Sequence, residues 1–287
     1  LEYWLLDERF SDSLPQLEHL LRTEEYARLF DAFFQHLPFG TSGRRGPVGF
    51  GLNRFNPFTL GTSIQGHCEF LKLRHGDVPP SVVIAYDVRV FNDLRGTCNP
   101  DIENPLLGML SEDFARIAAG IYAANGIKTW FPRGEATEYV TTPELSFTIR
   151  ALKALGGLNI SASHNHPDDN GAKIYNSAGA QAIPPLDQEL AKIVESTTGS
   201  SSMPWEAALE AGLIELIPPE IHEQYIEANL QVSIQPSARS ARVAFSPLHG
   251  TGSSSVGRLL REAGFETHRL PGQDIPDGTF PSVPFRT

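Results

Sequence analysis

The chain has 287 residues and a formal net charge of −11, with 40% hydrophobic and 20% charged residues. It can therefore bury a sizeable core, as one large domain or two smaller ones. So acidic a protein is a poor partner for nucleic acid or an anionic membrane. The two cysteines, Cys68 and Cys98, argue against a disulfide framework, and the sequence has neither a basic signal region nor ~20 consecutive apolar residues. These features predict a cytoplasmic metabolic enzyme.

The first predicted elements are a helix, a strand and an irregular span. Residues 81–86 form a continuous apolar run, typical of a buried strand, and the Asn-, Pro- and Gly-rich residues 91–107 predict an irregular connection. Before them, Thr23 is placed to cap a helix whose apolar residues recur with helical spacing, which predicts a face buried in the core. That stripe consists of Tyr26, Leu29, Phe30, Phe33, Phe34 and Leu37.

Helices and strands then alternate along the chain. A helix capped by Ser111 leads to a strand over residues 127–131. Thr142, followed by proline, caps a second helix that ends at Gly156, and residues 158–162 form the next strand. This alternation implies right-handed crossovers and a sheet with a parallel core. The sequence therefore predicts an α/β fold.

A small, polar segment divides the predicted elements into two groups. Residues 196–202 are all Ser, Thr or Gly, a composition typical of a linker. We therefore expect one domain over residues 1–198 and a second over residues 199–287. The second domain is expected to contain two helices with an apolar strand between them, followed by a strand-loop-helix unit that begins at Arg242.

Residues 161–173 gather a nucleophile, two imidazoles, two carboxylates and a lysine directly after a predicted strand. Open α/β sheets bind ligands at such strand ends. In one interpretation, Ser163 carries a phosphoryl group whose charge His164 and Lys173 stabilise. In a second, the H-x-H-x-D run of residues 164–168 holds zinc ions that activate water. In a third, the segment is a solvated turn.

Two other segments have the character of phosphate-binding loops. Residues 39–46 read Phe-Gly-Thr-Ser-Gly-Arg-Arg-Gly, and the glycines and small hydroxyl side chains, Thr41 and Ser42, suit a backbone that approaches a phosphate closely. Arg45 adds a planar cation suited to phosphate oxygens. Residues 245–252 read Phe-Ser-Pro-Leu-His-Gly-Thr-Gly and lie between a predicted strand and a Ser-rich helix start.

In this order, the three segments resemble the α-D-phosphohexomutase family, which comprises phosphoglucomutases and phosphomannomutases. The family has FGT(S/A)GxRG near its N-terminus, then (T/S)ASHNP followed by NGxK, then a PLHGxG-type segment. Residues 51–56, 62–66 and 83–89 also resemble GxxRMN, TQG and VIGYDxR of the long, phosphoglucomutase/phosphopentomutase-like branch. The chain departs from the family at His166, which is inserted after Asn165 and lengthens the loop.

The resemblance implies a fold and an activity. The implied fold has mixed, largely parallel sheets sandwiched by helices, with phosphohexomutase domain I followed by an incomplete domain II. The implied activity is that of an isomerase of the EC 5.4.2 class, an intramolecular phosphotransferase that interconverts sugar 1-phosphate and sugar 6-phosphate through a phosphoserine and a bisphosphorylated intermediate. Glucose is the expected sugar, with glucose 1,6-bisphosphate as activator, and phosphomannomutase or phosphopentomutase activities are alternatives.

The resemblance also implies roles for individual residues. Ser163 is expected to be phosphorylated in the resting enzyme and to hold Mg²⁺ through its phosphate. His164, Lys173 and Arg45 are expected to act with it in catalysis. The residues expected to bind phosphate or substrate are Thr41, Ser42, Arg45, Asn165, Lys173 and His249.

Family members place a DGDxDR metal loop shortly after an FP-containing stretch, and this sequence ends soon after Phe280 and Pro281 with no D-x-D anywhere. Its first residue is Leu1 rather than Met. We therefore expect the N-terminal half of a larger enzyme, without domains III and IV and inactive alone. Two hypotheses from other classes stay open: a zinc-dependent metallohydrolase that uses the H-x-H-x-D run, and an inactive truncated binding module.

Overall fold

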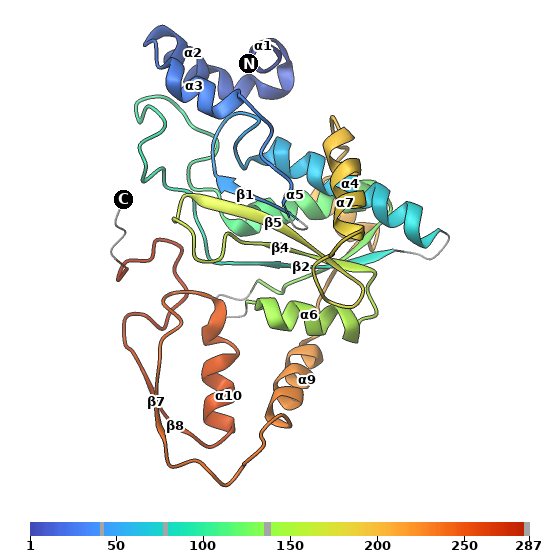
Figure 1. Cartoon of the computed structure of the whole chain (residues 1–287), viewed down its shortest axis with the longest axis vertical. Coiled ribbons are helices and arrows are strands. Elements are labelled where there is room, and N and C mark those ends of the chain that lie inside the picture. The colour runs from blue at the N-terminus through green and yellow to red at the C-terminus, as the bar shows by residue number, and fades with distance from the viewer. Residues whose placement is uncertain (41–42, 77–79, 135–138, 284–287) are drawn as a thin grey trace.

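A six-stranded sheet is the centre of the computed structural model, which describes residues 1–40, 43–76, 80–134 and 139–283. The strands lie in the order β1-β5-β4-β2-β3-β6 (Figure 1). Their bounds are β1 Gly43–Pro47, β2 Ser81–Tyr86, β3 Lys128–Phe131, β4 Gly156–Ile160, β5 Asp169–Asn176 and β6 Ile214–Leu216.

Four neighbouring strands of this sheet run parallel, and one strand is reversed. The parallel pairs are β4 with β2, β2 with β3, and β3 with β6. Every residue of β4 is buried, as expected for a strand covered on both faces. The reversed strand, β5, pairs antiparallel with both β4 and β1. The expected parallel core is confirmed, and the antiparallel pairs at one edge make the sheet mixed.

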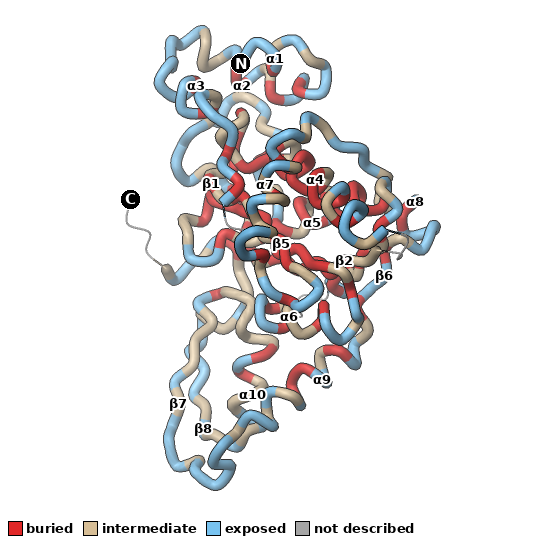
Figure 2. The backbone as a smooth tube through the Cα atoms, turned by 45° about the vertical axis from the view of Figure 1, so that its right-hand side comes forward, coloured by how far each residue is buried: buried red, intermediate tan, exposed pale blue. Residues whose placement is uncertain are grey.

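Helices cover both faces of the sheet. One face carries α4 (Pro57–His75), α5 (Ser111–Ala124) and α7 (Leu186–Ser196), and the other carries α6 (Thr142–Ala151) and α9 (Pro219–Leu230) (Figure 1). The buried residues concentrate in the sheet and in these layers (Figure 2). The predicted α/β fold, with helices on both sides of a mixed sheet, is therefore confirmed. Of the helices that the structure describes, none has the length and apolar character needed to cross a bilayer.

The N-terminal segment forms a separate small layer above the sheet (Figure 1). Its helices are α1 (Glu2–Leu6), the 3-10 helix η1 (Glu8–Ser13), α2 (Leu14–Arg22) and α3 (Tyr26–Phe33), which pack around the buried side chains of Trp4, Phe10, Leu17 and Leu29.

The prediction that the whole stripe on α3 is core is wrong. Tyr26, Phe30 and Phe34 are exposed, and only Leu29, together with Leu37 beyond the helix, is buried. One reason is that α3 buries only a narrow face, which contains Leu29 and Ala32. The other is that α3 ends at Phe33, so the helical spacing does not extend to Leu37.

The strands that follow the predicted boundary at residue 198 contribute to two different sheets. After α8 (Trp205–Glu210), β6 pairs with β3 and so extends the large sheet. The later strands, β7 (Arg242–Phe245) and β8 (Glu266–Arg269), form a separate two-stranded parallel sheet. They are joined by the 3-10 helix η2 (Thr251–Ser253) and α10 (Val256–Glu262). The division into domains 1–198 and 199–287 stays a prediction.

Two predicted helix boundaries differ from the observed ones. Thr141, not Thr142, occupies the N-cap of α6, and that helix ends at Ala151, well before Gly156. Ser111 is the first residue of α5 rather than its cap, since Leu110 precedes it in extended backbone. The positive-φ residue Lys153 lies between α6 and β4, and it ends the helix earlier than the glycines suggested.

A buried histidine makes the stability of this fold depend on pH. His67 of α4 lies 2.7 Å, through Nδ1, from the Tyr122 hydroxyl of α5, and burial lowers its pKa to about 3. The unfolded chain has a histidine pKa near 6.5 and so binds more protons below that pH. As the pH falls from about 6.5 to about 3, we expect His67 to lower the free energy of unfolding by about 1.4 kcal/mol per pH unit.

Urea unfolding of wild type and His67→Gln at several pH values measures this contribution. The variant should show a flatter pH dependence, whereas His36→Gln, a change at an exposed histidine, should match wild type. Equal slopes for wild type and His67→Gln would rule the contribution out.

Candidate active site

Residues 161–168, here called the serine loop, connect β4 to β5 at one end of the sheet. The predicted position, at the carboxyl end of a buried strand, is confirmed because β4 ends at Ile160. Lys173 differs from expectation in its setting. It lies within β5, opposite Asn159 of β4, rather than in the loop itself.

A single buried arginine organises the serine loop. Arg89 is 3% exposed, and its guanidinium donates hydrogen bonds of 2.6–3.2 Å to five backbone carbonyl oxygens. The accepting carbonyls are those of Ser163, Asn165, His166, Pro167 and Asp169. A planar cation with five N–H donors can hold several carbonyls at once, so Arg89 gives the loop a fixed path.

Asp87 connects this arginine to the position of Ser163. Its Oδ2 accepts from Arg89 Nε at 3.1 Å and from the Ser161 hydroxyl at 2.6 Å. Its Oδ1 accepts from the Ser111 hydroxyl at 2.6 Å. The Ser161 Oγ in turn accepts from the Ser163 backbone N–H at 2.9 Å. The carboxylate therefore ties β2, α5 and the serine loop together.

Ser163 itself is exposed, and its backbone lies in the left-handed region with φ of +58°. Non-glycine residues rarely adopt this region, and they do so at some energetic cost where the surroundings fix them. Here the fixed neighbours are Arg89 and Ser161. The Ser163 Oγ lies 3.3 Å from His164 Nδ1, so the hydroxyl faces a group that can exchange its proton.

Two cations lie on one face of the sheet beside the serine loop. Lys173 is opposite Gly43 in β1 and Arg45 is opposite Gly171 in β5, so both side chains point to the same side. Arg45 Nη1 donates to Asn165 Oδ1 of the loop at 3.3 Å. Burial, and then the charge of Arg45, lower the pKa of Lys173. An anion bound between the two cations would relieve this repulsion.

The remaining predicted binding residues have different outcomes. Thr41 and Ser42 lie outside the described residues. His249 is buried after β7, where its Nδ1 lies 3.2 Å from the Ile275 carbonyl and its Nε2 lies 2.7 Å from the Ser282 hydroxyl. Because a carbonyl only accepts, Nδ1 is the donor and Nε2 accepts from Ser282. Both ring nitrogens thus have partners within the chain, and the phosphate-binding role of His249 stays a prediction.

The side chains of the described residues around the serine loop do not fit a metal centre. His166 Nδ1 accepts from the Asp168 backbone N–H at 3.2 Å, while His164 faces Ser163. Asp168 has one buried oxygen without a partner, but its other oxygen accepts from the Arg95 backbone N–H at 2.9 Å. In the part of the chain that the structure describes, no three His, Cys, Asp or Glu side chains are grouped to hold a metal ion. We therefore derive no step through zinc or Mg²⁺.

Sequence reasoning missed the residues that hold the loop in place. Asp87 and Arg89 belong to the 83–89 segment that resembles a family motif, but their residue types alone predicted no role for them. Arg95 was not singled out at all. Its guanidinium donates to Asp169 Oδ1 at 2.6 Å, and Asp169 Oδ2 accepts from Asn165 Nδ2 at 2.9 Å. The contacts of Arg89 and Arg95 with the loop join segments far apart in the sequence, and no local pattern reveals them.

The fold and this site define a class: α/β/α proteins with an exposed serine on a loop at the end of the sheet. Residues 109–200 match the family model described as phosphoglucomutase/phosphomannomutase, alpha/beta/alpha domain I. A phosphoglucomutase of Staphylococcus aureus (strain bovine RF122 / ET3-1) is 31% identical over 285 residues, and a phosphopentomutase of Homo sapiens is 29% identical over 293 residues. These matches cover 98% of this chain, but 46% and 44% of the two relatives.

Solved structures agree with these sequence matches. A protein of Thermus thermophilus, named as a candidate phosphomannomutase, has a TM-score of 0.64 at 27% identity, over 87% of this chain and 48% of its own. Residues 109–200 therefore match domain I of the phosphoglucomutase/phosphomannomutase family, and the chain as a whole is similar to members of that family. It spans about half the length of the curated relatives it matches.

Replacing Arg89 tests its role in holding the serine loop. A lysine has a compact ammonium that cannot reach five carbonyls, and it leaves Asp87 poorly paired. We expect Arg89→Lys to lower the free energy of unfolding by about 3 kcal/mol or more, with faster amide hydrogen exchange in residues 161–169. Chemical denaturation and exchange mass spectrometry measure the two effects.

Arg95→Lys is the matched control, because the Arg95 side chain pairs with Asp169, directly after the loop, but is a third exposed. The Arg95→Lys variant should lose no more than about 1 kcal/mol in its free energy of unfolding. Similar losses for the two variants would contradict the special role of Arg89.

Proposed function

We propose that Ser163 is a phosphoryl carrier and that the protein interconverts sugar 1-phosphates and sugar 6-phosphates. The observation that carries this proposal is the presentation of Ser163. A hydrogen-bonded network holds its backbone in a left-handed conformation, so that the hydroxyl is exposed next to His164. The cations Arg45 and Lys173 lie on the adjacent sheet face.

The geometry suits transfer of a phosphoryl group more than hydrolysis by a metal-bound water. When phosphoserine donates to a sugar hydroxyl, the bond from phosphorus to Ser163 Oγ breaks and a bond from phosphorus to the sugar oxygen forms. The proton of that hydroxyl passes to solvent, and Ser163 Oγ takes up another proton as the phosphoryl group leaves. His164, whose Nδ1 lies 3.3 Å from Ser163 Oγ, would supply that proton and then regain one from solvent. Arg45 and Lys173 stabilise the phosphoryl oxygens by charge, which is the main requirement of this reaction.

The second transfer completes the isomerisation. The sugar bisphosphate must present its other phosphate to Ser163, and the same bond changes then run in reverse. The proposed intermediate is therefore a bisphosphorylated sugar, and glucose 1,6-bisphosphate is the proposed priming donor. Mg²⁺ is proposed as the cofactor on the grounds of family resemblance alone, since the described residues do not fit a metal centre.

Glucose is the proposed sugar, with pentose and mannose phosphates as alternatives. The relatives named above divide between a phosphoglucomutase and a phosphopentomutase at nearly equal identity, which supports the reaction type more than one sugar. Comparing the turnover of glucose, mannose and pentose phosphates by the protein would rank these three.

Phosphoryl transfer to Ser163 is the test of the proposed function. Incubation with glucose 1,6-bisphosphate, followed by digestion and mass spectrometry, should give phosphate on Ser163 in wild type and none in Ser163→Ala. His164→Gln should be labelled more slowly, by about 10²-fold or more, because it lacks a proton-transfer group. The measured quantity is the labelled fraction of the peptide with time.

Two outcomes would overturn the assignment. Phosphate on Ser161 in place of Ser163 would move the carrier to the other serine. Tight binding of sugar phosphates without label on either serine would favour an inactive binding module.

A further inference from the structure

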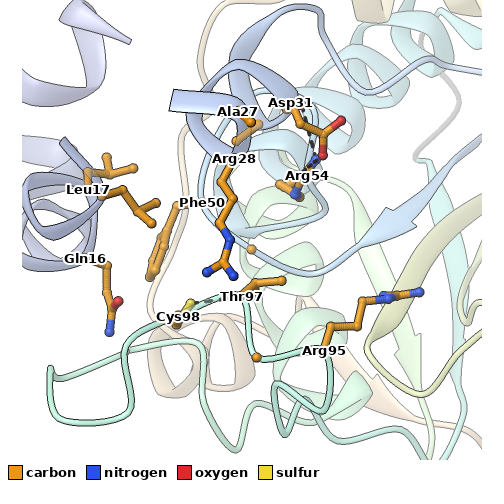
Figure 3. Close-up of a pocket in the computed structure, with 14 residues that line it drawn as sticks. Gln16, Leu17, Ala27, Arg28, Asp31, Phe50, Arg54, Arg95, Thr97 and Cys98 are labelled. Carbon is orange, nitrogen blue, oxygen red and sulfur yellow. Dashed lines mark hydrogen bonds and ion pairs between the residues drawn. The ribbon is translucent and has the colours of Figure 1, made fainter. Parts of the chain in front are cut away.

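A cavity of about 350 Å³ lies between the N-terminal helices and residues 95–98, apart from the Ser163 hydroxyl (Figure 3). Its volume is within the range typical of small-molecule sites. Apolar side chains from α2, α3 and the chain after β1 form much of its wall, and Phe50 lies beside Leu17 in Figure 3. The wall residues of this kind are Leu17, Leu20, Ala27, Ala32 and Phe50.

The charged residues of this cavity are mostly cationic, in contrast to the acidic chain as a whole. Arg28, Arg54 and Arg95 line it, and Asp31 is the one carboxylate among the lining residues that the structure describes. Arg54 is paired with Asp31, and Arg95 with Asp169 of β5. Arg28 Nε lies 3.6 Å from Glu25 Oε2, a long ion pair between two side chains that are both about half exposed. Its guanidinium points across the cavity toward Thr97 in Figure 3.

The neutral polar groups around the cavity already have partners. The Gln16 amide bonds to the backbone of Asn99 and Ile102, and the Thr97 hydroxyl donates to Asp93 at 2.6 Å. Burial, and then the charge of Asp93, raise the pKa of the Cys98 thiol to about 11, so this sulfur carries no charge at neutral pH. Arg28 is therefore the lining group best placed to bind a charged ligand.

We propose that this cavity binds a small phosphate monoester with a planar apolar substituent. The phosphate would pair with the Arg28 guanidinium, which can bind two oxygens at once, and the substituent would pack against the Phe50 side chain where it lines the cavity. Arg28 is the lining arginine with the weakest pairing, and a phosphate dianion attracts its guanidinium more strongly than a singly charged carboxylate does. This site is separate from Arg45 and Lys173, so it does not depend on the proposed mutase reaction.

Calorimetric titration with phenyl phosphate tests the proposal, because this probe combines the two expected features. It should bind at least tenfold more tightly than inorganic phosphate or phenol, and more tightly than benzoate. Arg28→Gln, a change at a half-exposed side chain, should weaken binding at least tenfold. Ala27→Trp places a large ring in the cavity from an exposed position and should abolish binding.

Arg45→Gln is the matched control for binding at the serine loop, and it should leave the affinity for phenyl phosphate unchanged. Weaker binding in Arg45→Gln but not in Arg28→Gln would place the probe at Ser163 and overturn the proposal. So would equal affinity for wild type and Ala27→Trp, tighter binding of benzoate, or no heat of binding at millimolar probe. Labelling of Ser163 is a separate measurement, so failure of this proposal is distinguishable from failure of the proposed function.

Discussion

The buried ion pair between Asp87 and Arg89 is the interaction on which the candidate site depends. Burying two charges is costly unless their remaining donors and acceptors are satisfied. Here four carbonyls of the serine loop, the carbonyl of Asp169 at the start of β5, and two serine hydroxyls supply those partners. The loop and the ion pair therefore require each other. Without the loop, Arg89 would keep Asp87 as an acceptor but lose the five carbonyls. Without Arg89, Ser163 would lose one of the two contacts that fix its positive φ, and the one with the Ser161 hydroxyl would remain.

The reversed strand and the C-terminal segment both converge on this pair. Because β5 turns back beside β4, it brings Lys173 next to the serine loop. Strand β1 pairs with β5 and brings Arg45 to the same place. From the other side, Phe280 places its ring 5.8 Å from the Arg89 guanidinium, and a side chain at Gly278 would collide with the Val88 carbonyl. Segments distant in the sequence thus surround the same ion pair.

Sequence patterns predicted the elements that are governed by local chemistry. The strand at Ser81–Tyr86 was predicted with the bounds observed, because a continuous apolar run is distinctive. In contrast, β1 consists of Gly, Arg and Pro, and β5 begins with Asp, Asn and Gly, so neither has the alternation that indicates a strand. Both are strands because of their pairing partners. The error on α3 has the same origin, since spacing shows which side chains share a face but not whether anything covers that face.

Ser163, His164 and Lys173 could be predicted as candidate site residues from their residue types and the motif. The contacts of Arg89 and Arg95 that hold the serine loop could not, because they join segments far apart in the sequence. The most direct test of the account is a ³¹P NMR titration of the protein phosphorylated on Ser163. If Arg45 and Lys173 face the phosphate, its second pKa should lie below the ordinary value of about 6 and rise toward it in Arg45→Gln. A pKa at or above that value, unchanged in Arg45→Gln, would contradict the account.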